Sequence, residues 1–329
     1  MISVRGVARA AVVALVLLTA GTVQAVVIDT VSVGNAGNAA DTTGYGAVAY
    51  SYNIGKYEVT AGQYTEFLNA VAATDTYGLY TTRTTYNMWS SIYGCKIERT
   101  GSPGSYTYDV ASDYANRPVN FVSFWDACRF ANWLHNGQQG AGTTEYGAYT
   151  LTSDGITNNT ITRNTGAQWA VTSEDEWYKA AYYKSGGLDA GYWDYPTSSD
   201  TAPGRDMADA SGNNANIYDY GTPYPIDSDK YTTVAGEFQN SDSPYGTFDQ
   251  GGNVWEFNEL LYGPYRGLRG GSFTDGNAGY LYAGSRNIVN PTGGDDYFGN
   301  MGFRVSEVPE PATMGLLALG GLLALRRRR

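Results

Sequence analysis

The chain has 329 residues, which is enough for one large domain or two ordinary ones. Only 16% of its residues are charged and 14% are aromatic, so it has ample core material and is not an intrinsically disordered chain. Its 42 Gly and 29 Tyr favour a loop-rich fold over a helical bundle. The formal net charge of −11 argues against nucleic acid as a partner.

Several of the basic residues lie at the two ends, in segments that we expect to be removed. These are Arg5, Arg9, Arg326, Arg327, Arg328 and Arg329. Without them and Glu310, the chain keeps 15 basic and 31 acidic residues, a formal charge of −16. This balance fits an extracellular, cation-binding protein.

Residues 1–25 predict a secretory signal peptide. Arg5 and Arg9 form its charged start, Ala10 to Ala20 its apolar core, and Val23-Gln24-Ala25 a small-residue cleavage site. An uncleaved anchor is the alternative, but the apolar run is short for a membrane span.

Residues 307–329 contain a second targeting segment. Pro309, Glu310 and Pro311 precede an apolar stretch, Met314 to Leu325, which is followed by four arginines. This arrangement resembles the PEP-CTERM protein-sorting tail of Gram-negative bacteria. The resemblance implies a short transmembrane helix that meets the inner membrane only transiently, recognition by an exosortase-type sorting enzyme, and delivery to the cell surface or extracellular matrix. A plain C-terminal anchor is the alternative.

The first half of the body predicts one strand and two helices after an irregular lead-in at 26–49. A strand is expected over 54–59, and Thr60 with Gln63 forms a capping-box pattern. Apolar residues then recur at helical spacing at Tyr64, Phe67, Leu68 and Val71. Residues 74–116 predict loops and short strands, and a second helix is expected from Ser123 to a C-cap at Gly137.

A third helix is predicted from Ser173, with Glu176 completing a capping box, to Gly186-Gly187. A long run of turns follows, and residues 302–305 predict a closing strand. Because 50–306 shows no internal repeat or linker, we expect one α+β domain with low regular content.

Two cysteines, Cys95 and Cys128, leave two interpretations open. They could form a disulfide in an oxidising compartment, or Cys128 could be a small apolar helix residue.

The stretch 251–257 (GGNVWEF) combines glycines, a Trp and a carboxylate. Asp249, Asn253 and Glu256 place oxygen ligands around this turn, which suits a hard cation.

Five segments together resemble the formylglycine-generating enzyme (sulfatase-modifying factor) domain, a variant of the C-type-lectin-like fold. They are 55–60 (GKYEVT) with 63–68, 117–134 (from RPV to NWL), 173–177 (SEDEW), 252–256 (GNVWE), and 269–272 (RGGS) with 302–304 (GFR). They occur in the family's order and cover roughly 50–306.

The family's oxidase uses two copper-binding cysteines after the Arg-x-Gly-Gly-Ser segment. In this chain those positions fall at Asp275 and near Tyr280, and neither residue is a thiol. Because Cu(I) needs thiolates, no copper and no oxidase reaction are expected. Another branch of the fold is iron-dependent and needs several His ligands, whereas this chain has a single histidine, His135.

The resemblance further implies structural Ca²⁺. One family site falls on Asp249, Gly252, Val254 and Glu256. A second falls on Asn216 and Ile217, with later ligands at Asp229 and Tyr231, or with Asp227 in place of Asp229.

We therefore expect an exported, non-catalytic, calcium-stabilised domain that binds an extracellular polysaccharide or a surface protein. Exposed aromatic residues around 77–89 and 182–195 are candidates for that contact. The alternative is an enzyme with a rebuilt active site, for which the candidate pocket residues are Arg269, Asp275, Tyr280 and Arg286.

Overall fold

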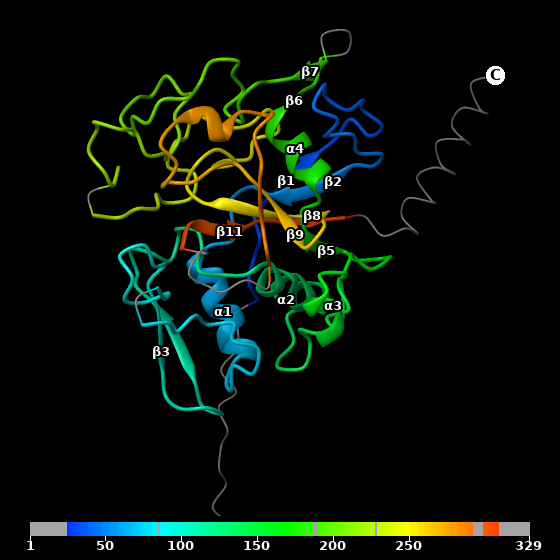
Figure 1. Cartoon of the computed structure of the whole chain (residues 1–329), viewed down its shortest axis with the longest axis vertical. Helices are drawn as coiled ribbons and strands as arrows, with labels where there is room; N and C mark the ends of the chain where they lie inside the picture. The colour runs from blue at the N-terminus through cyan, green and yellow to red at the C-terminus, as the bar shows by residue number, and fades with distance from the viewer. Residues whose placement is uncertain (1–24, 85, 187–189, 228, 292–298, 309–329) are drawn as a thin grey trace, which may run out of the picture.

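Two four-stranded sheets form the centre of the fold (Figure 1). In order across the first sheet lie β1 (Thr30–Val33), β2 (Tyr52–Gly55), β12 (Val305–Glu307) and β5 (Trp169–Val171). In order across the second lie β10 (Asn287–Val289), β9 (Tyr265–Arg269), β8 (Trp255–Tyr262) and β11 (Met301–Phe303). All pairs are antiparallel except β8 with β11.

This computed structural model describes residues 25–308 except 85, 187–189, 228 and 292–298. Most of the predicted signal peptide and the sorting tail from Pro309 onward lie outside the described residues. Two small hairpins complete the strands, β3 (Ile97–Thr100) with β4 (Thr107–Val110) and β6 (Tyr183–Lys184) with β7 (Gly191–Tyr192).

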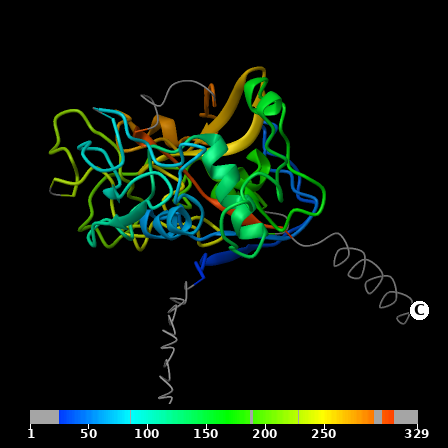
Figure 2. The same cartoon turned by 90° about the horizontal axis from the view of Figure 1, so that it is seen from below.

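The helices are α1 (Ala61–Val71), α2 (Phe124–His135), α3 (Ser153–Thr157) and α4 (Glu174–Tyr182), with a 3₁₀ turn, η2, at Ala278–Leu281. The capping boxes at Thr60, Ser123 and Ser173 are all present, which confirms the three predicted helix starts. In Figure 1, α1, α2 and α3 lie below the sheets and the long loops between β7 and β8 lie above them; Figure 2 shows the molecule from below, from the side of these helices.

Some predicted boundaries are wrong for identifiable reasons. The third helix ends at Tyr182 and not at Gly186, because Tyr183 pairs with Tyr192 in a strand. The lead-in contains β1, which pairs with β2, and the strand expected at 54–59 is β2 at Tyr52–Gly55. The closing strand is split into β11 and β12 at Arg304, whose side chain turns inward.

The largest apolar cluster joins α1 and α2 to the sheets. Phe67 of α1 lies 5.3 Å from both Phe130 and Trp133 of α2, measured between ring centroids, and Phe130 lies 5.4 Å from Phe303 of β11. All four rings are buried, so this contact holds the helices against the strands.

Cys95 and Cys128 are both buried free thiols, so the structure does not form the disulfide that the sequence left open. Burial raises the pKa of the Cys95 thiol to about 11 and that of Cys128 well above its usual range. Neither has the lowered pKa typical of a reactive thiol.

Within the described residues, no helix has the length and apolar composition needed to cross a bilayer.

Candidate functional site

The turn before β8 depends on left-handed backbone. Gly252 has φ of +82° and Asn253 has φ of +59°. A Cβ on Gly252 would lie 2.4 Å from the carbonyl oxygen of Asn216, so the close approach needs glycine. The Asn253 N–H donates to that same carbonyl at 2.8 Å. The two predicted calcium segments therefore lie side by side.

Glu256, the predicted carboxylate ligand on β8, forms a fully buried ion pair with Arg304. The Arg304 Nε donates to Glu256 Oε2 and Nη2 to Oε1, both at 2.6 Å, and the Trp177 indole donates to Oε2 at 2.8 Å. Arg304 also donates to the carbonyls of Gly55 and Phe248. A cation at Glu256 would have to share its carboxylate with Arg304.

Asn253 links this turn to Glu58, a residue that the sequence did not single out as a ligand. The Asn253 Nδ2 donates to Glu58 Oε1 at 3.2 Å, whereas Glu58 Oε2 has no hydrogen-bond partner. Burial and the neighbouring Asp249 carboxylate hold the pKa of Glu58 well above its usual range. Burial also raises the pKa of Asp249 to about 6, although Asp249 Oδ2 accepts from the Gly236 N–H at 2.6 Å.

The second predicted site is only partly brought together. Asn216 Nδ2 donates to the Tyr231 carbonyl at 2.8 Å, and Asn216 Oδ1 is buried without a partner. The Ile217 carbonyl accepts from the Arg205 Nε. The Asp229 side chain is 89% exposed and lies 3.6 Å from the Lys230 ammonium, so it points away from Asn216.

The rival ligand Asp227 is engaged elsewhere. Its carboxylate pairs with the Arg117 guanidinium at 2.5 Å. Of these two alternatives, Asp227 is thus paired with Arg117 and Asp229 lies beside Lys230.

The possible ligand atoms in this network are side-chain and carbonyl oxygens, which are the ligands that a hard cation prefers. Two of the oxygens, on Glu58 and Asn216, are buried and unpartnered. Over the described part of the chain, however, no three His, Cys, Asp or Glu side chains are grouped so that they could hold a metal ion. Backbone carbonyl and side-chain amide oxygens would therefore have to supply most of the ligands. The carbonyls of Gly252 and Val254 lie in the same turn.

The four candidate pocket residues form two pairs. Arg269 and Arg286 both lie over the Tyr45 ring, and Asp275 and Tyr280 both contact Trp255. Arg269 is buried and pairs with Glu174 at 2.6 Å, and Asp275 Oδ2 accepts from the Ser272 N–H and hydroxyl at 2.7 Å. Tyr280 packs edge-on against Trp255. Arg286 donates to the Tyr45 hydroxyl and lies over the Tyr45 ring.

Asp275 has the environment of a turn-forming carboxylate. Burial raises its pKa, and the two hydrogen bonds from Ser272 offset part of this effect. The Asp275 carbonyl also accepts from the Tyr218 N–H at 3.0 Å. Contacts with Ser272, Tyr218 and Trp255 thus fix Asp275 in place.

The family model described as "Sulfatase-modifying factor enzyme 1-like domain" matches residues 7–307. The chain belongs to this family. A second model, "PEP-CTERM protein-sorting motif", matches residues 307–329. That motif marks an exported protein that an exosortase-type system recognises in the cell envelope of Gram-negative bacteria.

One solved structure, CarF, supports the fold. The chain is 22% identical to CarF with a TM-score of 0.52, over 86% of this chain and 99% of that one. It also resembles Treponema denticola variable protein 1 (18% identity, TM-score 0.48, 85% and 95% covered) and PvdO from Pseudomonas aeruginosa (16%, 0.45, 85% and 92%). No curated protein matches the chain. The α+β, sulfatase-modifying-factor-like fold is thus confirmed.

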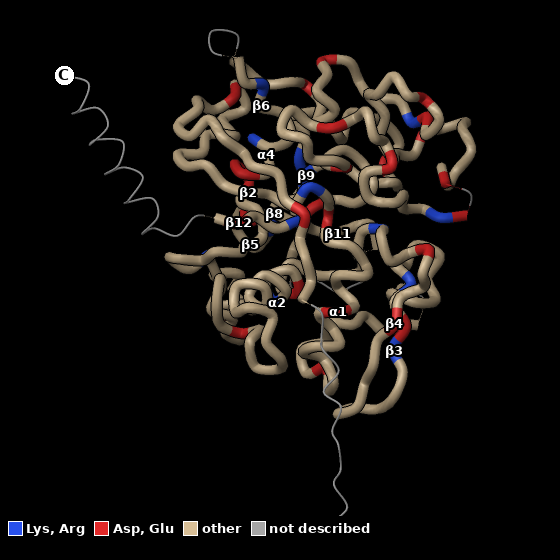
Figure 3. The backbone as a smooth tube through the Cα atoms, turned by 180° about the vertical axis from the view of Figure 1, so that it is seen from behind, with Lys and Arg blue, Asp and Glu red and all other residues tan. Residues whose placement is uncertain are grey.

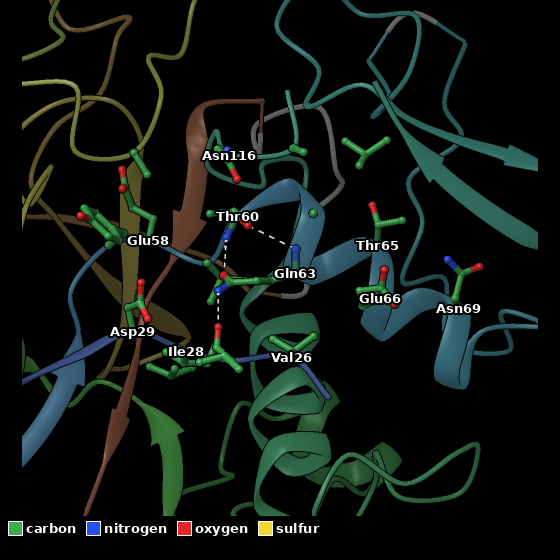
Figure 4. A pocket seen from close by; sticks show the side chains of 18 of the residues that line it. Val26, Ile28, Asp29, Glu58, Thr60, Gln63, Thr65, Glu66, Asn69 and Asn116 are labelled. Atoms are coloured by element: carbon green, nitrogen blue, oxygen red, sulfur yellow. Dashed lines mark hydrogen bonds between the residues drawn. The ribbon is translucent and has the colours of Figure 1, made fainter. Parts of the chain in front are cut away.

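A cavity of about 700 Å³ lies between the lead-in and α1 (Figure 4). Gln63 of the α1 capping box crosses it and donates to the Val27 carbonyl at 2.9 Å, which ties the lead-in to the helix. Carboxylates line it at Asp29, Glu58, Glu66 and Asp109. No Lys, Arg or His is among its described lining residues, so the cavity is acidic.

A second cavity, of about 550 Å³, lies beside β1 and β2 and is lined by Tyr52, Gln168 and Glu307 among others. Neither of these two cavities includes Asp275 or its predicted pocket partners.

The two predicted aromatic loops differ in exposure. In the first, Tyr77 is 48%, Tyr86 41% and Trp89 40% exposed. In the second, Tyr182 and Tyr183 are buried, whereas Tyr192, Trp193 and Tyr195 are partly exposed. The His135 ring is also structural, since its Nδ1 accepts from the Gln168 N–H at 3.1 Å.

Proposed function

We propose that this protein is an exported, non-catalytic binding domain that keeps the sulfatase-modifying-factor scaffold and acts at the cell surface or in the exopolysaccharide matrix. The family match and the sorting motif support the scaffold and the export route. The final destination and the binding role are part of the proposal.

The observation that carries the proposal lies after the Arg269-Gly-Gly-Ser segment. The resemblance places the two oxidase cysteines at Asp275 and near Tyr280, which hydrogen-bond and pack within their own loop and against Trp255. A carboxylate and a phenol cannot supply the thiolates that copper requires. Both cysteines of the chain are buried in other segments.

We also propose that Ca²⁺ stabilises the turn before β8. As the resemblance implies, Asp249 and Glu256 would hold it with their carboxylates and Gly252 and Val254 with their carbonyls, and the unpartnered buried oxygen of nearby Glu58 supports this placement. A second Ca²⁺ would be held by Asn216, Ile217 and Tyr231 with Asp229 or Asp227, and the unpartnered Asn216 Oδ1 supports that site. Bound calcium would offset the negative charge of the buried carboxylates.

The rebuilt-enzyme alternative has weaker support. Arg269 and Arg286 share the Tyr45 ring, and Asp275 and Tyr280 share Trp255. Neither described cavity contains any of the four.

An oxidase assay tests the non-catalytic role. Purified protein, copper and oxygen are incubated with a peptide that carries the sulfatase cysteine motif, beside an authentic formylglycine-generating enzyme as positive control. We expect no aldehyde above the level of a protein-free blank. Formylglycine in the reaction with this chain would overturn the proposal.

A further inference from the structure

Five tyrosines, four from the loops between β7 and β8 and one from the segment before β3, form a continuous series of edge-to-face contacts. In order they are Tyr93, Tyr231, Tyr224, Tyr218 and Tyr220, which we call the tyrosine ladder. Successive ring centroids are 4.6, 4.9, 4.7 and 4.9 Å apart, with interplanar angles of 66–70°. Phe273 closes one end, with its centroid 5.8 Å from those of Tyr93 and Tyr231.

The hydroxyl groups of the ladder have no hydrogen-bond partner among the described residues, unlike those of Tyr50, Tyr149 and Tyr182. The Tyr50 hydroxyl donates to Glu176, the Tyr182 hydroxyl to the Leu281 carbonyl and the Tyr149 hydroxyl to Glu259. Within the described part of the chain, no ladder hydroxyl has such a partner. Tyr220 is 77% exposed, and the other four rings are partly exposed.

The loop that carries three ladder rings is held in place before any ligand arrives. Arg205 donates to the carbonyls of Ile217 and Pro223, at 2.9 and 2.8 Å, and to the Thr222 hydroxyl. The Tyr220 ring rests on Gly276, where a Cβ would lie 2.6 Å from the ring carbon Cε2. Such pre-organisation reduces the entropy lost on binding.

The charge around the ladder restricts its ligand. Residues 193–250 contain ten acidic and two basic residues, and red positions outnumber blue ones over these loops in Figure 3. Arg205 is engaged with the loop itself, and Lys230 lies near Asp113 and Asp229. An anionic polymer would be repelled from this surface.

We propose that the tyrosine ladder is the contact surface for an uncharged polysaccharide. The rings offer apolar faces to the carbon faces of the sugars, and the free phenolic hydroxyls exchange hydrogen bonds with the sugar hydroxyls. This inference rests on the proposed binding function and assigns it a site and a ligand class.

Affinity electrophoresis of the full-length purified protein tests the proposal. The probes are dextran, xylan and galactomannan as neutral polysaccharides and alginate as an anionic one. We expect retardation by at least one neutral probe and none by alginate. Tyr220→Ala should weaken that binding about tenfold, since the loss of one stacked ring corresponds to about 1–1.5 kcal/mol. Tyr220→Phe should weaken it less, because it removes only the hydroxyl.

Tyr146→Ala is the matched control, because Tyr146 is 65% exposed and lies outside the ladder. It should bind like the wild type, and thermal unfolding should show that all three variants are folded. The proposal is overturned if no neutral probe retards the protein, if alginate binds as well, or if Tyr146→Ala loses as much affinity as Tyr220→Ala. Ladder-dependent self-association without polysaccharide binding would also overturn it. Formylglycine production in the oxidase assay would contradict the non-catalytic role, but the polysaccharide-binding result would still decide whether the ladder is the contact surface.

Discussion

The turn before β8 and the tyrosine ladder use polar side chains in opposite ways. In the strand after the turn, the Glu256 carboxylate is fully buried and accepts hydrogen bonds from Arg304 and Trp177. In the ladder, the hydroxyl groups have no protein donor or acceptor within the described residues, and Tyr220 faces solvent. The comparison separates a region that holds the scaffold together from a region that is free to contact a partner.

The largest effect should come from breaking the buried ion pair. Arg304→Met leaves the Glu256 carboxylate buried without its cation, which typically costs about 3–5 kcal/mol of unfolding free energy. Urea unfolding followed by tryptophan fluorescence measures the loss.

Adding Glu256→Gln to Arg304→Met is the control, because it removes the stranded charge. We expect the double variant to recover part of the lost stability. If the unfolding free energy of Arg304→Met falls by less than about 1 kcal/mol, the ion pair is not a main source of the scaffold's stability.

A second ion pair predicts the response to acid. Glu176 at the start of α4 is fully buried, and although burial alone would raise its pKa, the Arg163 guanidinium and the Tyr50 hydroxyl lower it from 4.5 to about 2. A carboxyl group with a lowered folded-state pKa gives stability above its unfolded pKa and loses it as the pH falls. This group should contribute about 3 kcal/mol at neutral pH, lost between about pH 5 and pH 2.

Glu176→Gln tests this prediction because it cannot ionise. Unfolding free energies measured from pH 7 to pH 2 should fall less steeply for the variant than for the wild type. Parallel curves would show that Glu176 has an ordinary pKa in the folded state.

The sequence predicted the starts of helices better than it predicted strands, whose partners lie far along the chain. Thr60, Ser123 and Ser173 carry their capping signals within three residues, so all three starts were found. β8 and β9 were missed although residues 255–258 alternate apolar and polar side chains as a half-buried strand does. Glu256 and Asn258, the polar members of this alternation, are buried on β8 instead of exposed, and the partner of Glu256 lies far along the chain at Arg304.

The candidate site shows the same limit. The GNVWE motif located the turn, but it could not show that Arg304 occupies the Glu256 carboxylate or that Glu58 is left with an unpartnered oxygen. Likewise, 29 tyrosines are visible in the sequence, whereas tertiary contacts decide which hydroxyls are partnered. Aromatic composition alone therefore could not show that Tyr182 and Tyr183, in one of the two predicted contact loops, are buried.

Calcium removal should have a moderate effect on the turn. If calcium is present at ten times its dissociation constant, it adds about 1.4 kcal/mol to the unfolding free energy. A chelator should therefore lower the melting temperature by about 3–5 °C for a domain of this size. Asp249→Asn should reduce this response, while Asp229→Asn, on the exposed side chain, should reduce it less. A melting temperature that ignores the chelator would remove calcium from the account.

The smallest effect on stability should come from the ladder. Tyr220→Ala removes a ring that is 77% exposed, so its unfolding free energy should stay within about 0.5 kcal/mol of the wild type. Calorimetry measures this difference, and a loss above about 2 kcal/mol would make the ladder part of the scaffold rather than a contact surface.

Hydrogen–deuterium exchange with and without a retarding neutral polysaccharide tests the contrast between the two regions most directly. We expect the polysaccharide to slow amide exchange in 218–224 and around Tyr93 and Tyr231, and to leave 251–257 unchanged. Slower exchange at 251–257 or around the lead-in cavity, with none in 218–224, would contradict the assignment of the ladder as the contact surface.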